Sequence, residues 1–247
     1  MKQKIKEGDK VLLLGKKNFL VRVRNENFQT EFGIIDLGSL MGKNYNSEVE
    51  THLGNKFFVV KPKFIDFLQK GLKRIPQIIS LKDCSFIAGY VGVSPDWKIL
   101  DAGSGSGFLA LFFANLVPKG KVYTYEIRKD FYEVAKKNIE NSGLKNIEIK
   151  NKDVREAKEK DLDLIILDLK NAEKVIPIVE KALKIGGFLV VYSPYIEQVK
   201  KVYKEMKNFS KKTFEVLVRD YNVGDFTRPK TKMIAHTGYI TIGRKIQ

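Results

Sequence analysis

The segment Ile99 to Phe108, with the sequence Ile-Leu-Asp-Ala-Gly-Ser-Gly-Ser-Gly-Phe, constrains the fold of this chain more than any other. An apolar run typical of a buried strand reaches Asp101 and then enters a turn with glycine at every second position. Glycine lets a backbone approach a ligand closely, and the helix predicted to follow offers free N–H groups at its start. The segment therefore predicts a strand, loop and helix that hold a cofactor by the backbone.

Acidic residues at the ends of the next strands discriminate between cofactors. Glu126 ends the predicted strand 121–126, about 20 residues beyond the loop, which is the distance expected for an acid that binds a ribose diol. Asp153 follows the predicted strand 147–150 in the same way. A dinucleotide-binding loop requires a small residue where this chain has Phe108, which disfavours NAD. The acids match S-adenosylmethionine-dependent methyltransferases better than dehydrogenases.

The pattern of predicted elements indicates two domains. Between residues 9 and 60, short apolar segments alternate with polar turns, as in a small β domain, and helical spacing over 62–73 predicts a bridging helix. From about residue 83, helices and strands alternate, which predicts a doubly wound sheet. We therefore expect residues 1–72 to form a small β-rich N-terminal domain with the bridging helix, and residues 73–247 to form an α/β domain with a Rossmann-like sheet.

The C-terminal half is predicted from the same patterns. Apolar runs predict strands over 162–168 and 188–192, and helical spacing predicts helices over 172–184 and 196–209. The last segments predict a closing hairpin in which 214–220 pairs with 234–244. In addition, Asp83 is expected to cap a helix that runs to Tyr90.

Basic residues exceed acidic ones by a wide margin. Lys and Arg number 45 against 29 Asp and Glu, a formal net charge of +16. Such an excess favours a polyanionic partner, with nucleic acid as the main candidate. The stretches 56–74 and 200–212 are the candidate binding surfaces, and a solvated protein surface is the alternative interpretation of each.

Several other classes of protein are disfavoured. Cys84 is the single cysteine, so no internal disulfide can form and a reducing compartment is expected. The N-terminus has no apolar signal region, and no apolar run reaches the ~18 residues of a membrane span, so we expect a cytoplasmic protein that does not bind membranes. His52 and His236 are too far apart in sequence to suggest a ligand cluster, and we expect no metal.

Six motifs between residues 70 and 245 resemble those of one family. They are Asp-Ala-Gly-Ser-Gly-Ser-Gly (101–107), Val-Tyr-Thr-Tyr-Glu-Ile-Arg-Lys-Asp-Phe (122–131), Asp-Leu (168–169), Tyr-Ser-Pro (192–194), Arg-Pro (228–229) and His-Thr-Gly-Tyr (236–239). In this combination the chain resembles the tRNA (adenine-N1)-methyltransferases that modify the T-loop, in their archaeal and bacterial form. Many methyltransferases share the first motif, whereas the second and the last together are specific.

The resemblance implies a class I methyltransferase that uses S-adenosylmethionine to methylate N1 of an adenosine in the T-loop of tRNA, and it implies a homotetramer. The cofactor site is then expected to comprise Gln77, Asp101, Gly103, Ser104, Gly105, Ser106, Gly107, Glu126, Arg128, Asp153 and Asp168. Within it, Glu126 is expected to bind the ribose hydroxyls and Asp153 the adenine amino group. Asp101 is expected either to bind the methionine end or to order the loop. Tyr192, Arg228 and His236 are the expected substrate-binding residues.

Asp168 is the residue that we expect to be catalytic. Adenine N1 already carries a nucleophilic lone pair, so the enzyme must align it with the sulfonium methyl and stabilise the positive charge that develops on the ring. A carboxylate that accepts a hydrogen bond from the exocyclic N6 amine serves both purposes. The alternative role for Asp168 is an N-cap of the helix expected near Ala172.

The chain departs from the family at two places. Lys170-Asn171 follow Asp168-Leu169 where the family has a proline, and Ser80 stands where the family has a tyrosine. The first departure affects the shape of the base pocket, and the second removes a ring that would stack on the adenine. Methylation of another RNA such as rRNA, or a non-catalytic tRNA-binding subunit, are the alternative functions.

Overall fold

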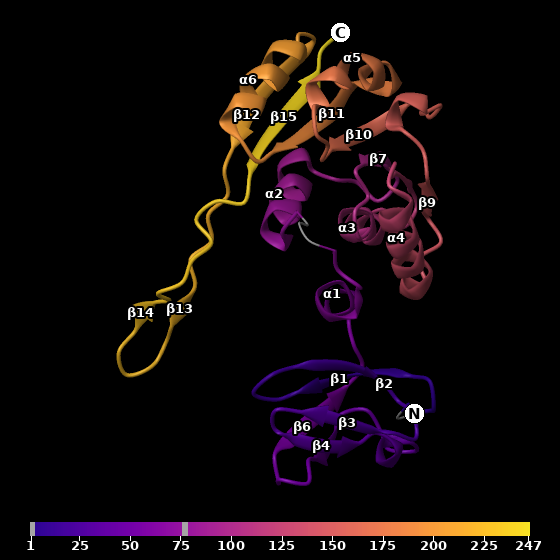
Figure 1. Ribbon diagram of the computed structural model, residues 1–247, viewed down its shortest axis with the longest axis vertical. Coiled ribbons are helices and arrows are strands. Elements are labelled where there is room, and N and C mark those ends of the chain that lie inside the picture. The colour runs from indigo at the N-terminus through magenta and orange to yellow at the C-terminus, as the bar shows by residue number, and fades with distance from the viewer. Residues whose placement is uncertain (1–2, 76–78) are drawn as a thin grey trace. The chain divides into compact units, whose positions relative to one another are not determined.

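The computed structural model describes residues 3–75 and 79–247, and it divides into two compact units, residues 1–72 and 73–247 (Figure 1). Gln77, expected in the cofactor site, lies outside the described residues. No helix within the described ranges is both long and apolar enough to cross a membrane.

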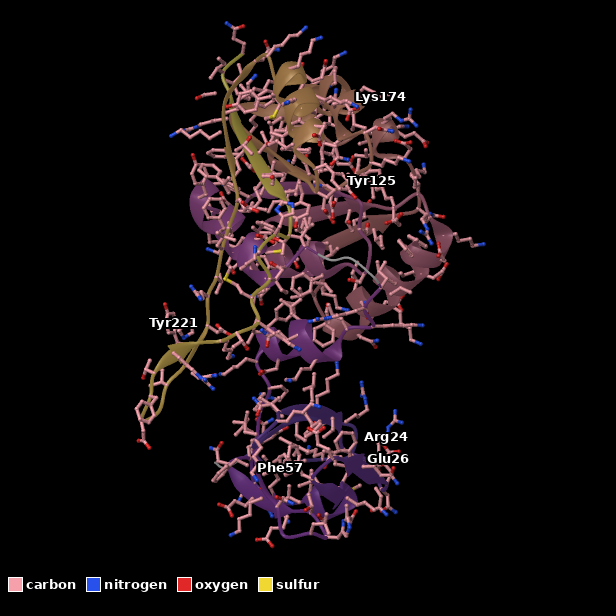
Figure 2. All side chains as sticks on the ribbon, turned by 60° about the vertical axis from the view of Figure 1, so that its left-hand side comes forward. Arg24, Glu26, Phe57, Tyr125, Lys174 and Tyr221 are labelled. Carbon is pink, nitrogen blue, oxygen red and sulfur yellow. The ribbon has the colours of Figure 1, made fainter. Side chains whose placement is uncertain are left out.

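The N-terminal unit is a small β structure. Its elements are β1 (Lys10–Leu14), β2 (Phe19–Arg22), β3 (Asn27–Thr30), β4 (Gly33–Asp36), the short turn η1 (Gly38–Leu40), β5 (Ser47–Glu50) and β6 (Lys56–Val60). Four strands form an antiparallel sheet in the order β2-β1-β6-β5, and β3 and β4 form a hairpin. Alternation along β6 buries Phe57, which packs edge-on against Phe19 and Phe32, and exposes Phe58 (Figure 2). Interleaved aromatic rings therefore form the core of this unit.

The helix expected over 62–73 is present but shorter. One turn, α1 (Phe64–Asp66), continues into a π-helical turn, η2 (Phe67–Gly71). The Asp66 carboxylate accepts a hydrogen bond from the Lys63 amide at 2.7 Å, which fixes the start of the helix. It ends at Gly71, where a Cβ would lie 2.5 Å from the Phe67 ring, so glycine is needed at this close contact.

The C-terminal unit is built around one seven-stranded sheet, with the strand order β12-β15-β11-β10-β7-β8-β9. The strands are β7 (Lys98–Ala102), β8 (Lys121–Tyr125), β9 (Ile147–Lys150), β10 (Leu162–Leu167), β11 (Leu183–Ser193), β12 (Phe209–Phe214) and β15 (Tyr239–Lys245). The pairs from β9 to β11 are parallel, and β15 runs antiparallel to both β11 and β12. The α/β class and the Rossmann-like sheet predicted from the sequence are confirmed.

Helices and short turns connect these strands. They are α2 (Leu81–Val91), α3 (Phe108–Leu116), α4 (Lys129–Ser142), η3 (Val154–Glu156), η4 (Ala172–Lys174), α5 (Ile176–Val179), η5 (Glu180–Ala182) and α6 (Ile196–Glu205). Consecutive residues 99–102 of β7 and 164–167 of β10 are all buried, as expected for parallel strands covered on both faces. Because parallel strands end at the same edge, the segments that follow β7, β8 and β10 meet there.

The prediction of one helix over residues 172–184 is wrong. The segment forms the three short turns η4, α5 and η5, and β11 already begins at Leu183 instead of residue 188. Pro177 lies in the first turn of α5, where its missing N–H is tolerated, but it cannot continue a helix from residue 172. The apolar residues of this segment are compatible with either structure, so their spacing alone was misleading.

The predicted closing hairpin has a different register. Residues 209–214 form β12 and pair with β15, so α6 ends at Glu205 rather than at residue 209. Glycine is needed at position 243 in this pairing, because a Cβ there would lie 2.3 Å from Met206 and 2.9 Å from Phe209. The Thr213 and Thr241 hydroxyls are hydrogen-bonded across the pair at 2.9 Å.

Residues 215–238, here called the arm, extend away from the sheet between β12 and β15 (Figure 1). The arm contains the short paired strands β13 (Tyr221–Asn222) and β14 (Arg228–Pro229). Its large apolar side chains are exposed, and they are Leu217, Val218, Tyr221, Val223, Phe226, Met233 and Ile234. Figure 2 shows Tyr221 on this projecting segment.

Candidate cofactor and substrate site

The glycine loop between β7 and α3 adopts backbone conformations that other residues rarely take. Gly103, Gly105 and Gly107 have φ values of +90°, +53° and +78°. At Gly103 space is restricted as well, because a Cβ would lie 2.2 Å from the carbonyl oxygen of Asp168. The Asp168 amide donates to the Ala102 carbonyl at 2.8 Å, which holds the ends of β7 and β10 together. The loop therefore depends on glycine for both conformation and close contact.

Glu126 follows β8 and is held in place by the loop. Its two carboxylate oxygens accept hydrogen bonds from the backbone amides of Gly105 and Arg128, each at 3.0 Å. The side chain is 6% exposed and lines a cavity. Because a carboxylate can accept about four hydrogen bonds, the two amides leave acceptor capacity for a diol.

The cavity beside Glu126, here called the larger cavity, has a volume of about 390 Å³, within the range of small-molecule sites. Its apolar lining is suited to a flat ring and consists of Ala102, Tyr125, Ile127, Val154, Leu169 and Val175. Its polar lining consists of Gly103, Glu126, Lys152, Asp153, Arg155, Lys170, Asn171 and Lys174. Two of these residues, Tyr125 and Lys174, are labelled in Figure 2.

Asp153 lines the larger cavity and is also the N-cap of η3. Its carboxylate accepts hydrogen bonds from the amide of Arg155 at 2.9 Å and from the guanidinium at 2.6 and 3.0 Å. These bonds to Arg155 lower the pKa of Asp153. The residue is therefore an ionised acceptor with part of its capacity already used.

Arg128 contributes to the site through its backbone amide. Its guanidinium pairs with Asp130 at 2.7 Å and lies 3.6 Å from the centre of the Phe131 ring. The side chain is exposed and lines neither of the cavities described here.

A smaller cavity shares Gly103 with the larger one. It is lined by Ile79, Asp101, Gly103, Ser104, Gly105, Ser106, Phe108, Leu109 and Asp168. Thr124 donates to the buried Asp101 at 2.6 Å, and the hydroxyls of Thr124 and Ser104 are 2.6 Å apart. Burial raises the pKa of Asp101 to about 8. This network supports the expectation that Asp101 orders the loop.

The Ser106 hydroxyl is buried without a hydrogen-bond partner among the described residues. It lines the smaller cavity, on the same loop that holds Glu126. Buried hydroxyls without a partner are uncommon in folded proteins because losing water is costly. A polar ligand in the smaller cavity would satisfy the Ser106 hydroxyl.

Asp168 lies directly after β10, and its carboxylate has no partner among the described residues. Burial, with a contribution from the Glu126 charge, raises its pKa to about 6. Within the described ranges, no hydrogen bond or ion pair engages its side chain. Asn171 occupies the N-cap position of η4, which excludes the helix-cap alternative for Asp168. The carboxylate is thus available to a group that enters the smaller cavity.

Tyr192 lies near the end of β11, the neighbour of β10 in the sheet. Its side chain is 9% exposed and is hydrogen-bonded to Thr237. Burial is the main cause of its raised pKa of about 12, and the charges of Asp83 and Asp168 add to it. A Cβ at Gly238 would lie 2.4 Å from the phenol ring, so glycine is needed where the chain passes it. The structure thus places Tyr192 close to Asp168, with its hydroxyl already bonded.

His236 lies at the base of the arm, and both its ring nitrogens are bonded within the protein. Nδ1 pairs with Glu215, and Nε2 lies 3.0 Å from the Pro194 carbonyl oxygen. The hydrogen bond with Glu215 raises the pKa of His236. An imidazolium can donate to both acceptors, so His236 ties the arm to the segment after β11. Arg228, by contrast, is exposed on β14 and lines neither cavity.

A buried polar cluster at the start of α2 carries no signal in the sequence and was not predicted. Asp83 is fully buried and accepts hydrogen bonds from Ser80, Lys82 and Thr237 at 2.7, 2.7 and 3.0 Å. The Lys82 ammonium also donates to the Val216 carbonyl at 2.6 Å and to Thr237 at 2.8 Å. The expectation that Asp83 caps the helix is wrong, because Ser80 stands at the N-cap and Asp83 bonds to the base of the arm. Thr237 lies 154 residues from Asp83, so no local pattern could have revealed the contact of this cluster with the arm.

Comparisons with known proteins agree with this geometry. Residues 68–237 match the family described as the tRNA methyltransferase complex GCD14 subunit. The chain is 36% identical over 261 residues to a tRNA (adenine(57)-N(1)/adenine(58)-N(1))-methyltransferase of Methanocaldococcus jannaschii. This alignment covers 92% of the present chain and 91% of the relative. It is 30% identical over 226 residues to a tRNA (adenine(58)-N(1))-methyltransferase of Thermus thermophilus, with 88% of each covered.

Solved structures resemble the whole chain. The tRNA (m1A58) methyltransferase of Aquifex aeolicus superposes with a TM-score of 0.87 at 27% sequence identity. The superposition covers 99% of this chain and 100% of the Aquifex aeolicus chain. A structure from Thermotoga maritima described as a SAM-dependent O-methyltransferase has a TM-score of 0.91 at 34% sequence identity. The match covers 99% of this chain and 95% of the Thermotoga maritima chain. Both names describe a methyltransferase, but they give different accepting atoms, adenine N1 in the first case and oxygen in the second.

Proposed function

The chain belongs to the tRNA methyltransferase GCD14 family, and on that premise we propose that it transfers a methyl group from S-adenosylmethionine to N1 of an adenosine in the T-loop of tRNA. The observation that carries the proposal is the Asp168 carboxylate, which has no partner among the described residues and lies beside the glycine loop. Residues 73–247 are the catalytic domain in this proposal, and residues 1–72 are a small accessory domain.

The residues around the two cavities fit the cofactor. Glu126 binds the ribose diol with the acceptor capacity that the two backbone amides leave free. The apolar walls of the larger cavity hold the adenine ring, and Asp153 accepts from its amino group. Ser106 and Asp101 lie toward the methionine end. When bound, S-adenosylmethionine supplies an electrophilic methyl group on a sulfonium.

Asp168 orients the substrate base. Its carboxylate accepts a hydrogen bond from the exocyclic N6 amine, which aligns N1 and stabilises the positive charge that the ring acquires. Burial in a site of low polarity strengthens this interaction. Because its pKa is about 6, Asp168 is mostly ionised at neutral pH and can act as this acceptor. Tyr192 borders the same site.

The partner in this proposal is a folded tRNA, and the active form is a homotetramer, consistent with a cytoplasmic location. The exposed apolar side chains of the arm support contact with a second copy of the chain, since such a concentration is unusual on a free surface. Arg228 lies on the arm, remote from the cavities in sequence and outside their lining. In a tetramer it reaches RNA bound by a neighbouring subunit.

The test compares Asp168→Asn with Asp96→Asn, a matched control at an exposed position that lines neither cavity. We expect Asp168→Asn to lower the single-turnover rate of methyl transfer to a tRNA transcript by ~10²-fold or more, as for loss of a preorganised electrostatic group. Its dissociation constant for S-adenosylmethionine, measured by calorimetry, should stay within a few-fold of wild type. A rate equal to that of the control would contradict the role of Asp168.

A further inference from the structure

Three lysines surround the larger cavity without an anionic partner among the described residues. Lys152 precedes η3, Lys170 precedes η4, and Lys174 ends η4. All three line the cavity and are exposed, and Figure 2 shows Lys174 at the outer surface of the C-terminal unit. No ion pair or hydrogen bond to another described residue engages their ammonium groups. These residues are here called the lysine rim.

The acidic groups near the rim are already committed or do not reach it. Asp153 is bonded to Arg155, the fourth cation of the lining, and Glu126 is bonded to two backbone amides. Asp168, two residues before Lys170, lines the smaller cavity instead. Within the described residues, neither Asp168 nor Glu156 nor Glu173 forms an ion pair with the rim. The positive charge of the rim is therefore not neutralised by this part of the protein.

Two other basic stretches of the chain each commit one lysine to contacts within the protein. In the stretch 56–74, Lys56 pairs with Glu48 and Glu50 at 3.6 and 3.4 Å. In the stretch 200–212, the Lys211 ammonium donates to the carbonyls of Tyr203 and Met206. The rim differs from both stretches in that its three lysines gather at one cavity.

We propose that the lysine rim binds the phosphodiester backbone of the RNA substrate across the mouth of the cofactor cavity. This inference rests on the proposed function, which makes RNA the polyanion. Ammonium groups on flexible stems bind phosphates without regard to sequence, which suits a backbone contact. Because the rim lines the cavity that holds the adenosine part of the cofactor, RNA bound there covers the cofactor. The cofactor therefore binds before the RNA and is released after it.

Lys170 gives the rim a charge that the resembling family lacks at this position. It stands where the resembling family has proline, which carries no charge. Asn171 follows with a φ of +59°, a conformation that asparagine tolerates better than most residues. The chain turns sharply there, and Lys170 and Lys174 both line the cavity on either side of the turn.

The first experiment measures the affinity for a tRNA transcript at several salt concentrations, with S-adenosylhomocysteine present. The rim variant is K152Q/K170Q/K174Q, and the control K136Q/K137Q/K145Q removes the same charge from exposed positions outside both cavities. Each lost phosphate contact reduces the slope of log affinity against log salt by about 0.7–0.9, so the rim variant should lose about two units and ~10–100-fold in affinity. The control should retain the wild-type slope.

The second experiment measures the dissociation rate of labelled S-adenosylhomocysteine with and without saturating tRNA. RNA should slow dissociation at least ~10-fold in the wild type and in the control, as expected for a ligand beneath a bound partner, and should have little effect in the rim variant. A rim variant with the RNA affinity and salt slope of the control would overturn the proposal. So would a loss of cofactor affinity without RNA, since it would assign the lysines to the cofactor.

The outcome also separates this inference from the proposed function. If the wild type methylates tRNA and the rim variant binds RNA like the control, only the rim is refuted. If RNA affinity falls in the rim variant but the wild type yields no N1-methyladenosine, the RNA-binding surface stands and the assigned reaction fails.

Discussion

Replacing Gly103 by alanine tests the packing that joins the cofactor loop to Asp168. The new Cβ would lie 2.2 Å from the Asp168 carbonyl oxygen, so the two strand ends must separate by about 1 Å to reach an ordinary carbon–oxygen contact. The positive φ adds about 1–2 kcal/mol of strain and the overpacking about 1–3 kcal/mol. We expect Gly103→Ala to lower the free energy of unfolding by about 2–5 kcal/mol.

Gly143→Ala is the matched control, because Gly143 also has a positive φ, +78°, but a Cβ added there would have no atom within 4 Å. It should lose about 1–2 kcal/mol from backbone strain alone. In thermal denaturation, each kcal/mol corresponds to about 2–4 °C for a chain of this size. Gly103→Ala should also slow methyl transfer, because Asp168 moves with its carbonyl, whereas Gly143→Ala should not. Equal losses of stability and equal rates in the two variants would refute the reasoning.

Three further predictions concern single groups. Glu126→Ala should weaken S-adenosylmethionine binding by about 1–3 kcal/mol through loss of charge-assisted hydrogen bonds, and unchanged affinity by calorimetry in a folded variant would remove Glu126 from the site. Lys82→Met should destabilise the protein by about 3–5 kcal/mol, because the buried Asp83 loses its counter-charge. It should also speed proteolysis at the base of the arm, which Lys82 contacts. A urea denaturation midpoint equal to that of the wild type would contradict this prediction. Since Asp168 must be ionised to accept a hydrogen bond and its pKa is about 6, kcat/KM should fall about tenfold per pH unit below that value, and a flat pH profile would argue against its role.

The sequence was sufficient to predict the parts of the fold that depend on local signals. Apolar runs followed by acids predicted β7, β8 and β10, and because parallel strands end at one edge, they also predicted that Asp101, Glu126 and Asp168 lie near one another. The glycine loop was recognised because its need for positive φ and close contact is encoded in residue type. These elements line the two cavities that the proposed function assigns to the cofactor.

Features that depend on distant contacts could not be predicted. The pairing of β12 with β15 brings Met206 and Phe209 against Gly243, a contact that has no local signature. The Lys82 and Asp83 pair is explained only by Thr237, brought near by the fold. Lys170 was noticed as a departure from the family, but its place beside Lys152 and Lys174 required the structure.

The identity of the methylated atom tests the central claim most directly. A tRNA transcript is incubated with the purified chain and S-adenosylmethionine, digested to nucleosides and analysed by chromatography and mass spectrometry, alongside a transcript whose T-loop adenosines are replaced by guanosine. The proposed function predicts N1-methyladenosine in the first transcript and none in the second. A ribose O-methylated nucleoside, or N1-methyladenosine that persists after the replacement, would contradict it.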